Sequence, residues 1–230
     1  MFRKLLSIFN LDGQLKHTQP NTVGRFSPYA QSEANLIYNL LFCDDMPLFK
    51  PKEGQIPTSW QSIIFEPNQN NEEIGKIAED HNQESRVRIL AFNILRENKL
   101  PVPPKQLLGV IVEIPLDGGL DVVAAYQDGR ARYINQTGKM AIFEGGPPEI
   151  EAKAKALVAS AVPTVNAIGP WDKERLPPPV KGMARMTFLV SDGLYFGEGP
   201  FAQLQNNSMA SSIIKSASEL LLLAVKTVVK

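Results

Sequence analysis

Cysteine and histidine are scarce in this chain of 230 residues, which has one cysteine and two histidines. Because Cys43 is the one cysteine, no intramolecular disulfide and no cysteine-based zinc site can form. His17 and His81 lie far apart in the sequence, and neither is part of a pattern with metal-ligand spacing. We therefore expect no metal site, no cofactor and no catalytic triad that depends on histidine.

An excess of charge of either sign is also missing, since 24 lysines and arginines balance 24 aspartates and glutamates. A basic face that neutralises phosphates is the usual sign of nucleic-acid binding, so we expect no nucleic-acid partner. The apolar run at residues 220–225 is too short to cross a bilayer. Residues 1–10 lack the long apolar core of a secretory signal and predict a short amphipathic helix or a frayed end. We expect a cytoplasmic protein with no membrane partner.

Known catalytic motifs are absent from the sequence. There is no GxxxxGK[ST] phosphate loop, no GxGxxG dinucleotide fingerprint, no GxSxG and no HExxH. Cys43 is followed by Asp44 and Asp45, and neighbouring carboxylates make a thiol a poorer nucleophile, not a better one. Whether the chain is an enzyme therefore stays open.

Residues 107–144 hold the clearest structural pattern in the chain. Four apolar runs are separated by glycine-containing turn signals at positions 117–119, 128–129 and 137–138. Asp-Gly pairs suit tight hairpin turns, because both central residues of such turns need positive φ. Connections this short cannot return the chain to a parallel strand. The stretch therefore predicts a four-strand antiparallel meander.

The rest of the pattern adds a second hairpin and several helices. Residues 185–190 and 194–197 read as strands joined by a turn at Ser191-Asp192-Gly193. Helical spacing of apolar residues occurs within 32–43, 58–65, 71–98, 148–168 and 208–228. We expect Arg86, Arg88, Arg96 and Glu97 to lie mostly on the outer face of their helix, and Pro163 to break or kink its helix.

This order of elements predicts an α+β fold, in which an antiparallel sheet (the four-strand meander plus the later hairpin) is flanked by helices on one face. Residues 100–104 contain three prolines and mark the best candidate boundary. We predict a mainly helical N-terminal part over residues 1–100 and an α+β sheet domain over residues 101–230. Whether the two pack together as one domain is left open.

Three segments carry a resemblance to known sequences: ESRVRILAFNILREN, LLGVIVEIPLDGGLDVVAAYQDGRARYINQTGK and LVSDGLYFGEGPFAQLQ. They resemble those of an uncharacterised bacterial protein family that has no assigned activity. The resemblance implies a bacterial cytosolic protein, and it transfers no catalytic residue to this chain.

Two groups of side chains are candidates for a binding site. On the meander, polar and aromatic residues alternate, as they would along a groove for a small anionic or planar ligand or along a solvated sheet face. Farther along, aromatic residues fall in loops with glycine or proline, where they would anchor a protein partner or fold back over the core. The candidates are Tyr126, Arg132 and Tyr133 in the first group and Trp171, Tyr195 and Glu198 in the second.

Two function hypotheses follow from these candidates. The first is a non-enzymatic cytosolic interaction or regulatory module that binds a protein partner or itself through an exposed sheet face or the aromatic loops. The alternative is a small-molecule-binding protein or enzyme with a pocket over the antiparallel sheet. A closed pocket with converging polar groups would favour the alternative, whereas a large flat apolar patch would favour the first hypothesis.

Overall fold

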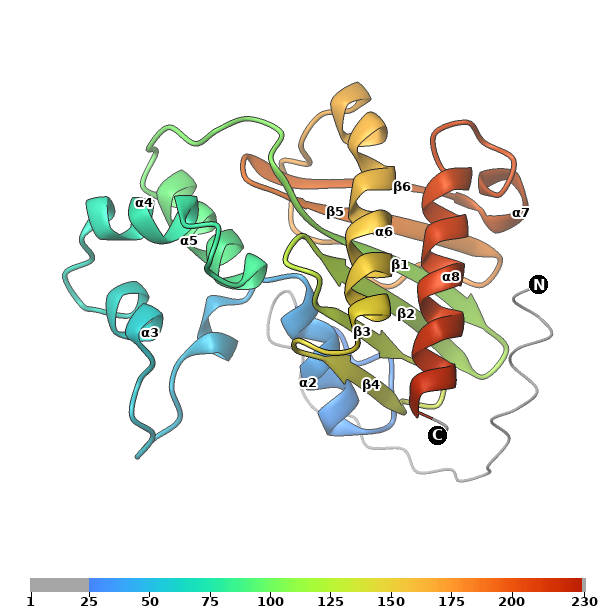
Figure 1. Cartoon of the computed structure of the whole chain (residues 1–230), viewed down its shortest axis with the longest axis horizontal. Helices are drawn as coiled ribbons and strands as arrows, with labels where there is room; N and C mark the ends of the chain where they lie inside the picture. The colour runs from blue at the N-terminus through green and yellow to red at the C-terminus, as the bar shows by residue number, and fades with distance from the viewer. Residues whose placement is uncertain (1–24, 229–230) are drawn as a thin grey trace.

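The computed structural model describes residues 25–228 and is built around one six-stranded antiparallel sheet (Figure 1). The strand order is β4-β3-β2-β1-β5-β6. The predicted meander is β1 (Leu107–Leu116), β2 (Gly119–Tyr126), β3 (Ala131–Ile134) and β4 (Met140–Phe143). The later hairpin is β5 (Met183–Val190) and β6 (Gly193–Pro200), and β5 pairs with β1. The predicted α+β class is confirmed.

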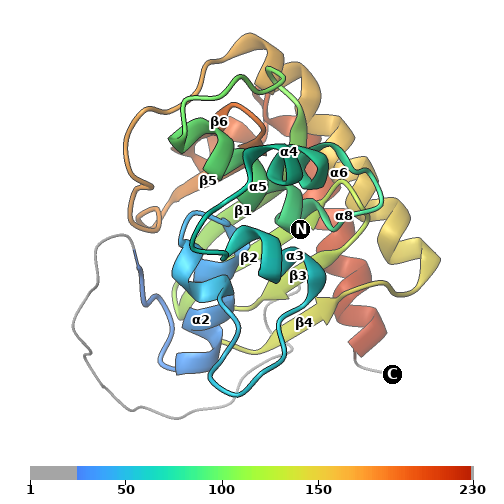
Figure 2. The ribbon, with the colours of Figure 1, turned by 90° about the vertical axis from the view of Figure 1, so that its left-hand side faces the viewer.

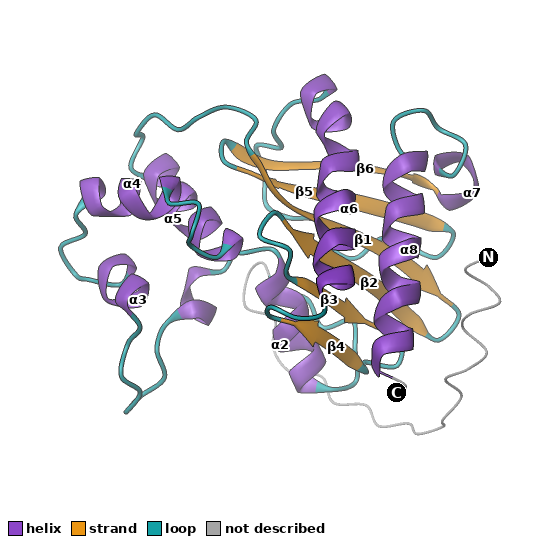
Figure 3. Cartoon of the chain, in the orientation of Figure 1, coloured by secondary structure: helices purple, strands orange, loops and turns teal. Residues whose placement is uncertain are grey.

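Helices occupy the segments in which apolar residues recur at helical spacing (Figure 3). In the segment 58–65, Thr58 caps the start of the helix through a capping box with Gln61, as expected for a threonine at that position. The predicted helix or frayed end at residues 1–10 lies outside the described residues. The helices are α2 (Ser32–Leu41), the 3₁₀ turn η2 (Met46–Phe49), α3 (Ser59–Ile64), α4 (Asn71–Glu79), α5 (Ser85–Glu97), α6 (Pro148–Ala167), α7 (Phe201–Leu204) and α8 (Ser211–Val228).

Helices cover both faces of the sheet, and the expectation of helices on one face is wrong (Figure 2). The strands explain why, since both sets of alternating side chains are apolar. On β1, Val112 belongs to a buried cluster with α6 and α8, whereas Ile111 belongs to a cluster with α2, α4 and α5. A strand that is apolar on both sides must be covered on both sides.

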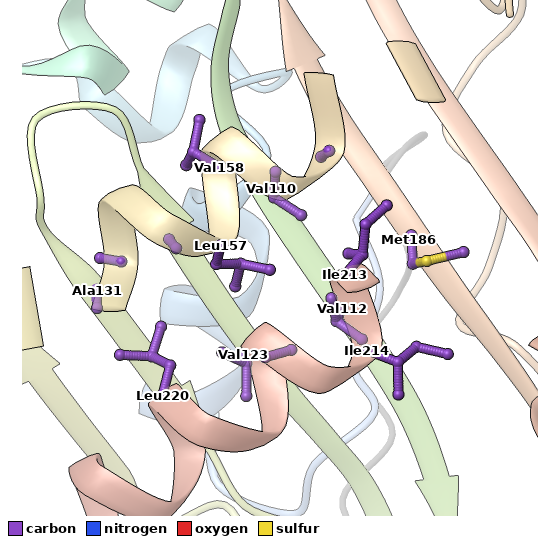
Figure 4. Close-up of a cluster of buried hydrophobic side chains, with 14 of the residues drawn as sticks. Val110, Val112, Val123, Ala131, Leu157, Val158, Met186, Ile213, Ile214 and Leu220 are labelled. Carbon is purple, nitrogen blue, oxygen red and sulfur yellow. The ribbon is translucent and has the colours of Figure 1, made fainter. Parts of the chain in front are cut away.

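The first cluster fixes α6 and α8 on the sheet (Figure 4). Val112 and Val123 from the sheet meet Leu157 of α6 and Ile213 of α8 there. Pro163 does not end α6, which runs on to Ala167. The last turn is held by tertiary contacts, because Thr164 donates a hydrogen bond to the Met209 carbonyl at 2.7 Å and Val165 is buried.

The second cluster joins residues on both sides of the proposed boundary at residues 100–104. Leu90 of α5 and Tyr38 of α2 share it with Ile111 and Val122 of the sheet. The division into residues 1–100 and 101–230 stays a prediction. Within residues 25–228, no helix combines the length and apolar character needed to cross a membrane.

Candidate functional site

The sheet residues predicted as a groove are divided between the two faces of the sheet. Tyr126 is fully buried in the cluster beneath α2 and α5, and its hydroxyl donates to the Leu41 carbonyl at 2.9 Å. Arg132 faces the same side, is buried, and forms an ion pair with Glu144. Tyr133 lies on the opposite face, in the cluster with α6 and α8. The sheet face that we expected to be exposed is therefore covered, because helices pack on both sides.

The second predicted group is tied to the β5–β6 hairpin. Trp171 is half-buried, pairs with Leu194 through its backbone, and packs edge-on against Phe196 with the ring centroids 5.0 Å apart. Tyr195 is buried and its hydroxyl donates to Asp192 at 3.1 Å. Glu198 accepts a hydrogen bond from Arg185 at 2.7 Å. Each of these side chains has a structural partner, and their role in binding stays a prediction.

Asp121 is the hydrogen-bond partner of Tyr133, and its titration should be visible in the stability of the protein. Burial raises the pKa of this carboxyl to about 6, although it accepts hydrogen bonds from the Gln136 amide and the Tyr133 hydroxyl. The folded state therefore holds the proton more tightly than the unfolded state. The stability contributed by this proton is complete below the unfolded pKa and is lost as pH rises through the folded value.

We expect the free energy of unfolding to fall by about 1 kcal/mol through Asp121 as pH rises from about 5 to about 7. Urea unfolding of the wild type and of Asp121→Asn at both pH values measures this change in the free energy of unfolding. Asparagine keeps an acceptor oxygen for the Gln136 amide but cannot titrate. An Asp121→Asn variant with the same pH dependence as the wild type would contradict the assignment.

A polar cavity of about 400 Å³ lies where four segments meet: the turn between α4 and α5, the start of α5, the turn between β2 and β3, and α6. It therefore draws on helices from both layers, at the ends of two sheet strands. Its lining is almost entirely polar, in contrast to the two apolar clusters. The lining residues are His81, Asn82, Gln83, Ser85, Arg88, Gln127, Asp128, Arg130 and Lys155.

Local hydrogen bonds fix the walls of this cavity. Asp80 accepts a hydrogen bond from the Asn82 amide at 2.9 Å, which closes the turn between α4 and α5. Ser85 and Asp128 then join the start of α5 to the β2–β3 turn through two bonds. The Ser85 amide donates to the Asp128 carboxylate at 2.7 Å, and the Asp128 amide donates to the Ser85 hydroxyl at 3.0 Å. Gly129, at φ 91°, has no side chain to collide with Glu151 of α6.

Arg88 is the most informative residue of the cavity, because it is a cation that is only 2% exposed. Its Nε donates to the Ala78 carbonyl at 2.9 Å and its Nη1 donates to Gln127 at 3.2 Å, with His81 3.4 Å away. Among residues 25–228, its Nη2 has no hydrogen-bond partner and no carboxylate forms an ion pair with it. Burial lowers the pKa of Arg88, but arginine stays charged in proteins.

The expectation that Arg88 lies on the outer face of its helix is wrong. Arg88 is three residues before Ala91 and seven before Leu95, both of which are buried, so it shares their side of α5. That spacing was the signal in the sequence for a position on the buried side of α5. Arginine is usually exposed, and the sequence alone gave no partner that would hold it inside.

The charges that line the cavity are mostly positive. Arg130 reaches it from the β2–β3 turn and pairs with Asp128 at 3.0 Å, and Lys155 reaches it from α6 and pairs with Glu151 at 2.5 Å. Asp128 is the one carboxylate among the lining residues, while Glu144 pairs with Arg130 and Glu151 with Lys155 from outside the lining. The amino end of α5 adds a partial positive charge. Such an arrangement favours a bound anion.

A separate buried polar cluster lies under the loop 168–182. Glu113 of β1 is fully buried and accepts a hydrogen bond from the Tyr38 hydroxyl at 2.7 Å. Arg185 of β5 lies opposite Glu113 of β1 on one side and opposite Glu198 of β6 on the other. It donates hydrogen bonds to the carbonyls of Leu176 and Pro177. Burial raises the pKa of Glu113, while the charge of Arg185 acts in the other direction. This cluster connects the sheet to the loop.

Cys43 is fully buried, and its burial raises the pKa of the thiol to about 12. The thiol therefore stays protonated at neutral pH, which agrees with the expectation that Cys43 is a poor nucleophile. Within residues 25–228, no three histidine, cysteine, aspartate or glutamate side chains gather as a metal site.

Comparison with known proteins adds no identification, since no family model, no curated protein and no solved structure matches this chain. The resemblance to an uncharacterised bacterial family therefore stays a prediction. Any function has to be argued from the geometry of the chain itself.

Proposed function

We propose that this chain is a small-molecule-binding protein and that its ligand carries an anionic group, which binds in the polar cavity at the start of α5. The observation that carries the proposal is Arg88, a buried guanidinium whose Nη2 has no partner among residues 25–228 and which lines the cavity. A buried cation without an ion-pair partner costs free energy, which the charges of Asp80 and Asp128 offset only in part, and an anionic ligand would offset more of it.

The neighbouring groups support an anion over a neutral ligand. Arg130 and Lys155 come from two other elements and line the same space as Arg88. Arginine binds carboxylates and phosphates through two parallel hydrogen bonds, which gives both strength and orientation. The proposal assigns no catalytic residue, because it concerns ligand binding alone.

Titration calorimetry with inorganic phosphate at low ionic strength tests the proposal. We expect one saturable site per chain, and we expect Lys155→Ala to weaken binding about fivefold because it removes one charge-assisted contact. Lys153→Ala is the matched control, since Lys153 lies on the same helix but pairs with Glu219 outside the cavity. Absence of saturable binding to the wild type would overturn the proposal.

The hypothesis of an interaction module stays a prediction, with Trp171 as its best anchor. The sheet faces no longer support it, because both are covered by helices. We likewise propose a cytoplasmic location and a bacterial origin for this chain.

A further inference from the structure

A second cavity, of about 290 Å³, lies beside the first. Gln83 lines both, so the two cavities are neighbours at the turn between α4 and α5. The first lies toward α5, the β2–β3 turn and α6, and the second lies toward α3 and α4. The residues that line the second cavity are Ile63, Glu73, Lys76, Ile77, Asp80 and Gln83.

The second cavity differs from the first in chemistry. Ile63 of α3 and Ile77 of α4 give it apolar walls, which the first cavity lacks. Its charged residues are Glu73, Lys76 and Asp80, so carboxylates outnumber cations there. An anionic group is therefore disfavoured in the second cavity, and an apolar body with hydrogen-bond donors is favoured.

We infer that a single ligand occupies both cavities and that it is an organic phosphate monoester, with the phosphate beside Arg88 and the organic body against Ile63 and Ile77. This inference rests on the proposed function. Small-molecule sites usually have volumes of about 300 to 1,000 Å³, and the two cavities together fall in that range. Gln83, at the junction, would contact the bond between the two parts of the ligand.

The choice of phosphate over carboxylate follows from the number of acceptors. Arg88, Arg130 and Lys155 line the first cavity from three elements, and the carboxylates Asp128, Glu144 and Glu151 already pair with two of them. A phosphate monoester carries about −1.5 to −2 at neutral pH and has three acceptor oxygens, so it can bind all three cationic side chains. A carboxylate has two oxygens and a single negative charge.

Titration calorimetry with inorganic phosphate, phenyl phosphate and benzoate separates the two proposals. The wild type should bind phenyl phosphate about tenfold more tightly than inorganic phosphate, the effect of burying roughly 60 Å² of apolar surface. It should bind benzoate more weakly than phenyl phosphate. In Ile63→Ala the advantage of phenyl phosphate should shrink, while binding of inorganic phosphate stays the same. Ile56→Ala is the matched control, because Ile56 is 89% exposed and lies outside both cavities.

The outcomes are distinguishable. If inorganic phosphate binds but phenyl phosphate binds no more tightly, the two-cavity ligand is overturned and the anion site stands. An equal advantage in Ile63→Ala overturns it as well, since the organic body would then lie elsewhere. Benzoate that binds as tightly as phenyl phosphate overturns the assignment of a phosphate. If none of the three compounds binds, the proposed function itself fails.

Discussion

Replacing Arg88 with glutamine should weaken the binding of inorganic phosphate about a hundredfold, the largest effect that we expect at the cavity. Removing one partner of a buried, charge-assisted pair costs about 2 to 3 kcal/mol or more, which corresponds to this loss of affinity. Arg88 is nearly fully buried and its Nη2 has no other partner among residues 25–228, so the substitution removes a donor that is free to bind the ligand. Titration calorimetry on the purified variant measures the change.

The variant needs a control for folding, because Arg88 also donates to the Ala78 carbonyl and to Gln127. Arg96→Gln is a matched control on the same helix, since Arg96 contacts Ser191 and Asn93 and lies outside the cavity. We expect Arg96→Gln to bind phosphate like the wild type. Unchanged binding in a folded Arg88→Gln variant would show that Arg88 is a structural residue and would remove the main support for the anion site.

Replacing Arg185 with methionine should destabilise the folded protein by about 3 kcal/mol, the lower end of the cost of breaking a buried ion pair from one side, because its ion-pair partner Glu198 stays partly exposed. The substitution leaves Glu113 fully buried without the charge of Arg185, and it leaves Glu198 without its hydrogen bond. It also removes the donor to the Leu176 and Pro177 carbonyls, which ties the loop 168–182 to the sheet. Urea unfolding at neutral pH measures the loss.

A double variant separates the charge effect from the loss of packing. Adding Glu113→Gln to Arg185→Met should restore part of the stability, because a neutral amide is cheaper to bury than an unpaired carboxylate. Lys181→Met is the matched control, since the Lys181 side chain is 76% exposed and its ion pair with Asp117 contributes at most about 1 kcal/mol. A double variant no more stable than Arg185→Met would contradict the role given to the buried charge.

The strands and most helices could be predicted from the sequence because their signals are local. Turn residues at positions 117–119 and 128–129 and the apolar runs between them fix the hairpins within a few residues of chain. The stripe from Ile150 to Ala161 likewise marks one face of α6. The continuous apolar character of β1 also contained the signal for cover on both faces, although we expected helices on one face only.

The cavity could not be predicted in the same way, because its walls come from residues 81–88, 127–130 and 155 and meet only in the folded chain. Polar residues such as Gln127 and Lys155 look like ordinary surface positions in the sequence. The spacing of Arg88 from Ala91 and Leu95 indicated its side of α5, but the groups that pack around Arg88 and Glu113 come from other segments, which no local pattern records. The aromatic and polar residues that did stand out, such as Tyr126 and Tyr133, are divided between the two faces of the sheet.

The sequence by itself determined the α+β class, the meander and the later hairpin, because hydrogen bonding between adjacent strands follows from short turns and apolar alternation. The tertiary structure alone decided that β5 pairs with β1, that helices cover both faces, and that three cations from separate elements line one cavity. The physical reason is the range of the interactions. Backbone geometry acts over a few residues, whereas burial and charge act between segments that only folding brings together.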